Sequence, residues 1–246
     1  MARFARRLAV AWFLILIPVE AFAVRPLDTE DTGTLEPGRI ELELSGDYAD
    51  AARETVGAFT GVLAAGVWRR LELKLGSSYL FIAPNGGAAA EGMGDSAVRL
   101  KYRLVDETRV IPAVLFAWTV RLPTGDEPRG LGEHGVDLGV LMAVSKTFAP
   151  ITLTWNGGYT FATADRRRDV WTLAGSLEYR LTDRWWAVGE LVSALSAERR
   201  PHEAVARVGA MYAVSRRLRL DAAVATGLTP RSPDVLVTLG LTLVLR

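Results

Sequence analysis

The sequence contains no cysteine and only two histidines, His134 and His202. Without cysteine the chain has no disulfide and no sulfur to carry a lipid anchor. Neither histidine lies in a predicted strand beside a serine, as an activated serine nucleophile would require. The sequence therefore predicts that the protein is not an enzyme.

A surplus of one charge is also missing, because 29 Lys and Arg face 28 Asp and Glu, for a formal net charge of +1. Nucleic-acid binders normally show a basic surplus, so no nucleic acid is expected as a partner. No phosphate-binding loop, zinc-ligand spacing or nucleotide fingerprint occurs, and the acids of residues 126–137 match no calcium loop. We expect no cofactor and no bound metal.

Long apolar runs are absent beyond the start of the chain. Three arginines precede the apolar residues 8–17, which Ala21-Phe22-Ala23 follows. This pattern predicts a secretory signal peptide over residues 1–23, and the cleavage-like Ala-Phe-Ala disfavours the alternative of an N-terminal anchor. No later stretch reaches the length of about 18 apolar residues that a membrane-spanning helix needs.

Residues 24–38, here called the lead-in, are polar, aperiodic and interrupted by two prolines and Gly38. They predict an irregular periplasmic segment before the first strand. Asp28, Glu30 and Asp31 give the lead-in a negative cluster. Two interpretations remain open: a solvated tail, or a segment that enters the pore mouth and contacts lumenal arginines, as in plugged barrels.

Residues 94–125 predict a hairpin of two strands with a short connection at residues 105–109. In the first half, Leu100 and Tyr102 belong to an apolar row that alternates with Arg99, Lys101 and Arg103. The second half opposes residues such as Trp118 to Thr119 and Arg121, although Ile111 and Leu115 blur the pattern. A period of two places apolar groups on one face of a strand and polar groups on the other.

The same alternation continues through residues 39–246 and predicts about twelve strands. The predicted connections alternate between long ones, such as residues 47–54 and 84–95, and short ones, as in outer-membrane barrels. Many aromatic residues, including Trp185 and Trp186, fall near strand ends, where rings sit at the lipid headgroups. Only a closed barrel satisfies every strand backbone group in lipid. We therefore predict an all-β, antiparallel transmembrane β-barrel over residues 39–246; a secreted soluble β-domain is the less favoured alternative.

If the apolar faces meet lipid, the opposite faces line the lumen. The charged residues predicted to line it are Glu41, Glu43, Glu72, Lys74, Arg99, Lys101, Arg103, Arg121, Asp137, Glu178, Arg180, Glu190, Arg207, Arg219 and Asp221. Acids and bases are nearly balanced, which favours internal pairing and a narrow passage over a selectivity ring of one sign. Alternatively, Arg99, Lys101 and Arg103 form an electropositive wall for anionic solutes.

Several segments resemble the outer-membrane family labelled putative MetA-pathway of phenol degradation. They are Arg25-Pro-Leu-Asp-Thr-Glu-Asp-Thr-Gly33, residues 37–43, Gly94-Asp-Ser96 with Lys101-Tyr102, residues 122–126, Gly135-Val-Asp137, Ser145-Lys-Thr-Phe148 and Asn156-Gly-Gly-Tyr159. The resemblance implies a bacterial outer-membrane barrel linked to passage of small aromatic or hydrophobic compounds. It implies no catalytic or binding residue. The chain ends in Leu-Arg246 where such barrels usually end on an aromatic residue.

Pattern and resemblance together predict a narrow pore or transporter for small solutes in the bacterial outer membrane. The alternative is a structural or adhesive barrel whose lumen is closed by salt bridges. A secreted soluble domain and an envelope enzyme are less favoured. The expected partners are outer-membrane lipid, the barrel assembly machinery and a small-molecule solute.

Overall fold

A computed structural model describes residues 25–196 and 203–246 of the chain. The predicted signal peptide, residues 1–23, and His202 lie outside the described residues. Within the described ranges, no helix is long and apolar enough to cross a membrane.

Almost the whole described chain from Ile40 onward is β-strand, with two short 3-10 helices, η1 (Glu127–Arg129) and η2 (Arg166–Arg168). Alternating side chains and the scarcity of internal proline favour this extended backbone. The strands are β1 (Ile40–Ala51), β2 (Glu54–Trp68), β3 (Leu71–Pro84), β4 (Ala90–Met93), β5 (Ser96–Val105), β6 (Ala113–Leu122), β7 (Asp137–Phe148), β8 (Ile151–Ala162), β9 (Val170–Arg180), β10 (Trp185–Ser196), β11 (Glu203–Ala213), β12 (Leu218–Gly227) and β13 (Val235–Val244).

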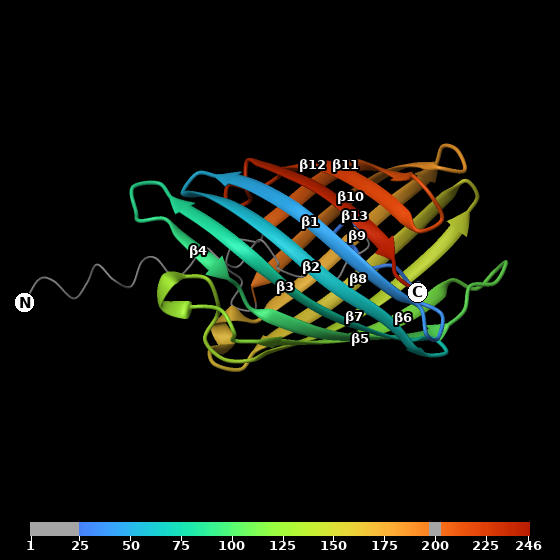
Figure 1. The fold of residues 1–246 in the computed structure, drawn as a ribbon, viewed down its shortest axis with the longest axis horizontal. Coiled ribbons are helices and arrows are strands. Elements are labelled where there is room, and N and C mark those ends of the chain that lie inside the picture. Colours follow the sequence, from blue (N-terminus) through green and yellow to red (C-terminus); the bar gives the residue numbers. More distant parts are fainter. Residues whose placement is uncertain (1–24, 197–202) are drawn as a thin grey trace, which may run out of the picture.

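The strands form one closed antiparallel barrel (Figure 1). Consecutive strands pair with each other, except that β5 pairs with β3 instead of β4, and β1 pairs with β13 to close the ring. β4 and β5 both pair with β3, at Tyr79–Ile82 and Leu71–Gly76, so the thirteen segments occupy twelve positions. Closure pairs the two ends of the described sheet with each other, and the predicted fold class is confirmed.

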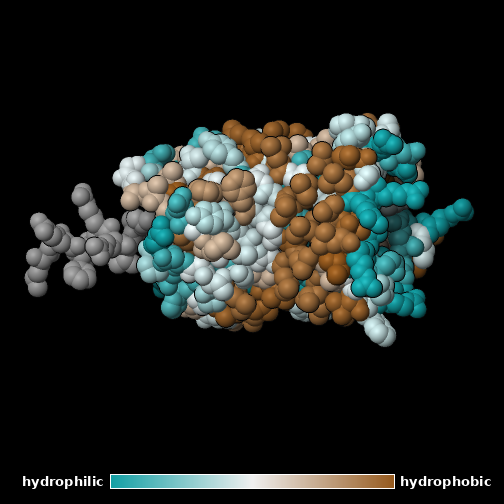
Figure 2. Space-filling model, viewed as in Figure 1, coloured by the Kyte–Doolittle hydropathy of each residue, from teal (hydrophilic) through white to brown (hydrophobic). Residues whose placement is uncertain are grey.

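The two faces of the wall differ in polarity. Outward side chains such as Leu100, Trp118, Val140 and Leu239 are exposed, and a hydrophobic band crosses the visible face between hydrophilic ends (Figure 2). Inward positions on the same strands carry buried polar groups such as Arg99 and Thr119. An exposed aliphatic band of this extent is typical of a surface that contacts lipid.

Two predicted connections are wrong in length. The first hairpin is joined by residues 52–53 alone, because the β1–β2 ladder continues to the pair Ala51–Glu54. The connection expected at residues 105–109 instead spans residues 106–112, because β6 begins only at Ala113. Elsewhere the asymmetry holds: connections such as 123–136 and 163–169 define a long-connection end, and 69–70 and 149–150 define a short-connection end.

Two side chains face the lumen against expectation. The alternation left Leu115 ambiguous, and it placed Trp186 on the outside. Leu115 is fully buried against Ala117 and Ala143, whereas Ile111 lies in the β5–β6 connection. Trp186, expected at a lipid headgroup, packs instead against a lumenal cluster that contains Leu27 of the lead-in. The outward position at this strand end belongs to its neighbour Trp185, which is exposed and lies 4.5 Å, between ring centroids, from Tyr212.

Candidate functional site: the lumen and its lead-in

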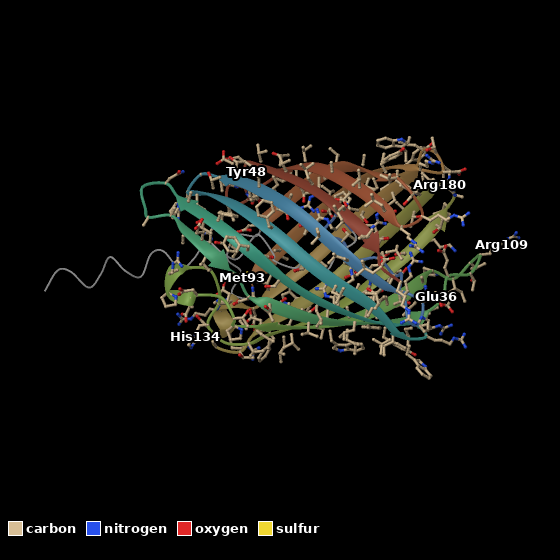
Figure 3. All side chains as sticks on the ribbon, viewed as in Figure 1. Glu36, Tyr48, Met93, Arg109, His134 and Arg180 are labelled. Atoms are coloured by element: carbon tan, nitrogen blue, oxygen red, sulfur yellow. The ribbon has the colours of Figure 1, made fainter. Side chains whose placement is uncertain are left out.

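The lead-in, described from Arg25, lies inside the barrel rather than in solvent. Leu27, Thr29, Glu30 and Thr32 are buried. Glu36 lies at the short-connection end, where Figure 3 also places Arg109 and Arg180. The lead-in therefore extends from the buried residues in the lumen to this end of the barrel. The sequence left two interpretations of the lead-in open. The structure agrees with a segment that contacts lumenal cations and not with a solvated tail.

Two glycines of the wall leave space for the lead-in, Gly66 for its backbone and Gly240 for the Arg25 side chain. A β-carbon on Gly66 would lie 2.6 Å from the carbonyl oxygen of Leu35 and would overlap that of Glu36, and one on Gly240 would lie 2.5 Å from Nη2 of Arg25. The amide of Gly38 also donates to the carbonyl of Gly66 at 2.8 Å. The close backbone approach at Gly66 requires a residue without a side chain.

Glu30 is the most deeply buried charge of the lead-in, with no exposed surface. Its carboxylate accepts hydrogen bonds from Nζ of Lys101 at 2.7 Å and Nη1 of Arg99 at 3.0 Å. Its backbone amide donates to Oδ1 of Asn156 at 2.6 Å, and the Asn156 amide donates back to the Glu30 carbonyl at 2.8 Å. The charge-assisted bonds join the lead-in to β5, and the two amide bonds join it to β8.

The β3–β5 register extends this cluster along the wall. It sets Glu72 opposite Lys101 and Lys74 opposite Arg99. Nζ of Lys101 lies 3.7 Å from Oε1 of Glu72, and Nζ of Lys74 lies 3.3 Å from Oε1 of Glu43. Since a charge in low dielectric needs a partner, the alternation of signs makes the cluster tolerable.

A second cluster joins the lead-in to β10 and β11. Arg207 donates to both carboxylate oxygens of Asp28, at 2.8 and 2.9 Å, and lies 2.9 Å from Glu190. Glu190 in turn accepts from the amides of Asp28 and Thr29, each at 2.9 Å, and from the Thr29 hydroxyl at 2.7 Å. The two-pronged guanidinium contact fixes orientation as well as position.

Arg25 completes the path against β12 and β13. Its Nη2 lies 3.3 Å from Oδ1 of Asp221 and donates to the Thr238 hydroxyl at 3.1 Å. Towards the other end of the lead-in, the amide of Leu35 donates to Glu72 of β3 at 2.7 Å. The lead-in thus contacts strands spaced around the whole ring, which narrows the lumen at mid-height. We call the wall groups that hold it the charged belt: Glu72, Arg99, Lys101, Asn156, Glu190, Arg207 and Asp221.

Each lumenal residue expected from the sequence lies on an inward position, at differing depths. Buried ones are Glu43, Glu72, Lys74, Arg99, Lys101, Asp137, Glu190, Arg207 and Asp221; partly buried ones are Glu41, Arg103, Arg121, Glu178 and Arg219; Arg180 is exposed. Their role as a solute-contacting lining stays a prediction.

Some of these residues lie outside the belt. Arg103 pairs with Asp106 at 3.0 Å and Arg180 with Asp183 at 2.8 Å, both near the short-connection end. Arg121 pairs with Asp137 at the long-connection end. Arg103 therefore does not join Arg99 and Lys101 in one free cationic wall, since each of the three contacts a carboxylate.

Sequence reasoning missed the neutral members of the site, Asn156, Thr29 and Thr238. Asn156 opens the Asn-Gly-Gly-Tyr segment and Thr29 lies in the Arg25–Gly33 segment, both of which carry the family resemblance. Their position in those segments could have identified Asn156 and Thr29 as members of the site. Thr238 is one of two threonines on the inward face of β13, with Thr242, and nothing in the sequence distinguishes it.

At the long-connection end, the β6–β7 loop (residues 123–136, including η1) folds over β3 and β4. Oδ1 and Oδ2 of Asp95 accept from the amides of Gly125 and Glu133, each at 2.9 Å. Glu133 contacts Arg168 of the next long connection. Burial raises the pKa of Glu133, while Arg168 and Arg121 oppose that shift.

The loop groups weighed for metal binding and surface charge have local partners. Nδ1 of His134 lies 3.0 Å from Glu127, and no cluster of three or more acidic or histidine side chains in the described ranges could hold a metal ion. Arg166 lies over the Phe161 ring, 3.9 Å from its centroid, and pairs with Asp169. The arginines at 166–168 therefore contribute to loop structure.

Comparison with solved structures shows the same fold at low sequence identity. The COG4313 outer membrane channel from Pseudomonas putida F1 matches with a TM-score of 0.68 and 15% identity, over 89% of this chain and 99% of that chain. The KdgM porin has a TM-score of 0.61 at 8% identity, over 82% and 98% of the two chains. The NanC porin has a TM-score of 0.59 at 9% identity, over 82% and 98%.

These similar structures are named as channels and porins rather than as enzymes. Among curated proteins, none matches this sequence. The family model described as "Putative MetA-pathway of phenol degradation" matches residues 23–245, nearly the entire chain. The chain therefore belongs to the family with that description, as its motifs predicted.

Proposed function

We propose that the protein is a bacterial outer-membrane barrel that passes small solutes through a lumen narrowed by its lead-in. The observation that carries the proposal is the lead-in itself, held at mid-height by Glu30 and Asp28 against cations on opposite parts of the wall. A segment held in this way sets the width of any passage beside it. The channel and porin folds of the similar structures support the proposal.

The charges of the passage are largely paired with one another, so its preference for ions of one sign is weak. Small aromatic or hydrophobic compounds are the candidate solutes, on the basis of the family description. The outward aliphatic band supports outer-membrane lipid as the surrounding medium, and the barrel assembly machinery as the partner for insertion. Gly38, the last residue of the lead-in, and Arg246 both lie at the short-connection end, the end that faces the periplasm in such barrels. We assign no catalytic role.

A structural or adhesive barrel is the second candidate, because buried salt bridges fill the same level of the lumen. Solute passage separates the two functions. Reconstituted wild-type protein should show a small single-channel conductance and allow liposomes to swell in small neutral solutes. A barrel that folds, as shown by heat-modifiable gel migration, but is electrically silent and solute-tight would reject transport.

Displacing the lead-in by sterics alone tests its part in that passage. Gly66→Ala places a methyl group against the lead-in backbone, and overpacking of this kind costs about 1–3 kcal/mol. Conductance should rise because the lead-in is shifted. Gly57→Ala on the same strand is the control, since a β-carbon there meets its nearest atom at an ordinary 3.7 Å. Equal conductance of the two variants would contradict a lead-in that limits flow.

A further inference from the structure

The β6–β7 loop covers a part of the lumen that the charged belt does not reach. Its Leu131 side chain is only 2% exposed and packs in a cluster with Val56, Ala58, Leu80 and Ile82 of β2 and β3. Ala90 of β4 packs against the same cluster. All members of the cluster are uncharged, so the inner wall formed by β2 and β3 at the long-connection end is an aliphatic surface.

The fit between Leu131 and the wall is close. A β-carbon on Gly92 would lie 3.0 Å from Cδ1 of Leu131, and one on Gly94 would lie 3.0 Å from Cδ1 of Leu80. Within the loop, Gly125 and Gly132 approach so closely that a β-carbon on Gly132 would lie 2.8 Å from Cα of Gly125. These glycines allow the loop to fold down and place one leucine on the wall.

The loop is joined to the barrel through few residues besides its strand junctions. Asp95 accepts two of its amides, Thr124 bonds to Gly94 and Ser96, and Glu133 contacts Arg168. The barrel ladder itself does not depend on these bonds, since β6 and β7 pair with each other from Ala113 to Arg121. The loop can therefore rise from the wall while the strands stay paired.

We propose that the aliphatic wall formed by Val56, Ala58, Leu80 and Ile82 is a binding site for the apolar part of an entering solute, and that Leu131 occupies it when no solute is bound. The site takes a small uncharged group of about the size of the leucine side chain it replaces. A charged group is excluded because none of these four wall residues offers it a partner. The inference rests on the proposed function for its biological meaning, but it concerns binding and can be tested without transport.

The test uses the absence of cysteine from the chain. Leu131→Cys is compared with Arg129→Cys, an exposed position in the same loop, by labelling with a water-soluble maleimide in lipid nanodiscs. The thiol at position 131 should react at least about tenfold more slowly than the thiol at position 129, because its reaction requires the loop to open. Heat-modifiable migration confirms that both variants are folded.

Isobutanol then serves as the probe, because its branched alkyl group matches the leucine side chain, and glycerol serves as the polar control. Isobutanol should raise the labelling rate of Leu131→Cys several-fold and leave that of Arg129→Cys unchanged, and glycerol should change neither. The proposal is overturned if the two variants react equally fast in buffer, or if isobutanol does not accelerate labelling at position 131. An electrically silent barrel that still shows the isobutanol effect would reject the proposed function while leaving this site intact.

Discussion

The lumen is narrowed at two levels by different interactions, ion pairs at one and an apolar contact at the other. At mid-height, the lead-in is held by buried ion pairs that centre on Glu30 and Asp28. At the long-connection end, the β6–β7 loop packs one leucine on an aliphatic wall and bonds through two amides to Asp95. An ion pair in low dielectric is specific and costly to break, whereas an apolar contact is non-directional and can be replaced by any group of similar size. The first level therefore suits a fixed constriction, and the second suits an exchangeable cover.

Removing the central acid should have the largest effect. Glu30→Ala leaves Arg99 and Lys101 buried without this carboxylate, a loss of about 3–5 kcal/mol for the bound lead-in. The lead-in should leave the wall, conductance should rise, and the reversal potential in a salt gradient should shift toward anion selectivity. Glu36→Ala, at an exposed position of the same segment, is the control. Unchanged selectivity in Glu30→Ala would mean that the belt does not line the passage.

Truncating the apolar cover should have an intermediate effect of a different kind. Leu131→Ala removes most of the loop's contact with the wall and should cost about 2–5 kcal/mol, as for other buried leucines. Conductance should rise without a change in ion selectivity, because no charge is lost or uncovered. Reversal potentials recorded beside those of Glu30→Ala test the distinction. A selectivity shift in Leu131→Ala would show that the two levels are coupled.

The smallest effect is expected from acidity acting on the β6–β7 loop. Burial raises the pKa of Glu133 in the folded loop, against Arg168 and Arg121 and with Asp95 and Glu127 nearby. The folded loop thus holds this proton more tightly than an open loop, so lowering the pH from about 7 to about 5 should favour the folded loop and reduce conductance. The change should stay below about 1 kcal/mol, since the Glu133–Arg168 pair is partly exposed.

Glu133→Gln supplies the matched variant, because it removes the titrating group and keeps the size of the side chain. Its conductance should fall less than that of the wild type when the pH is lowered over this range. A pH response that persists in Glu133→Gln would assign the effect to another group and would remove the loop carboxylate from this account.

The period of two predicted the barrel because apolar and polar residues alternate within each strand and so define an apolar face and a polar face. Leu100 and Lys101 are adjacent in sequence and lie on opposite sides of β5, as their alternation requires. The pattern failed where it is locally weak. Leu115 lies inside although its neighbours are equally apolar, and β4 forms in an expected loop because the long β3 extends past the end of β5.

The amino-acid sequence by itself determined the wall: its strands, its inward charges and its near balance of acids and bases. Only the tertiary structure decided which segments fill the lumen inside that wall. Glu30 and Arg99 are far apart in the chain, and a polar segment without periodicity gives no local sign of whether it binds water or lumenal cations. Leu131 likewise meets Val56 and Leu80 only once the ring has closed. Alternation is a property of neighbouring residues. These contacts instead join segments far apart in the chain, so they form only where the entropy lost in bringing the segments together is offset, and only where distant glycines such as Gly66 and Gly92 leave space.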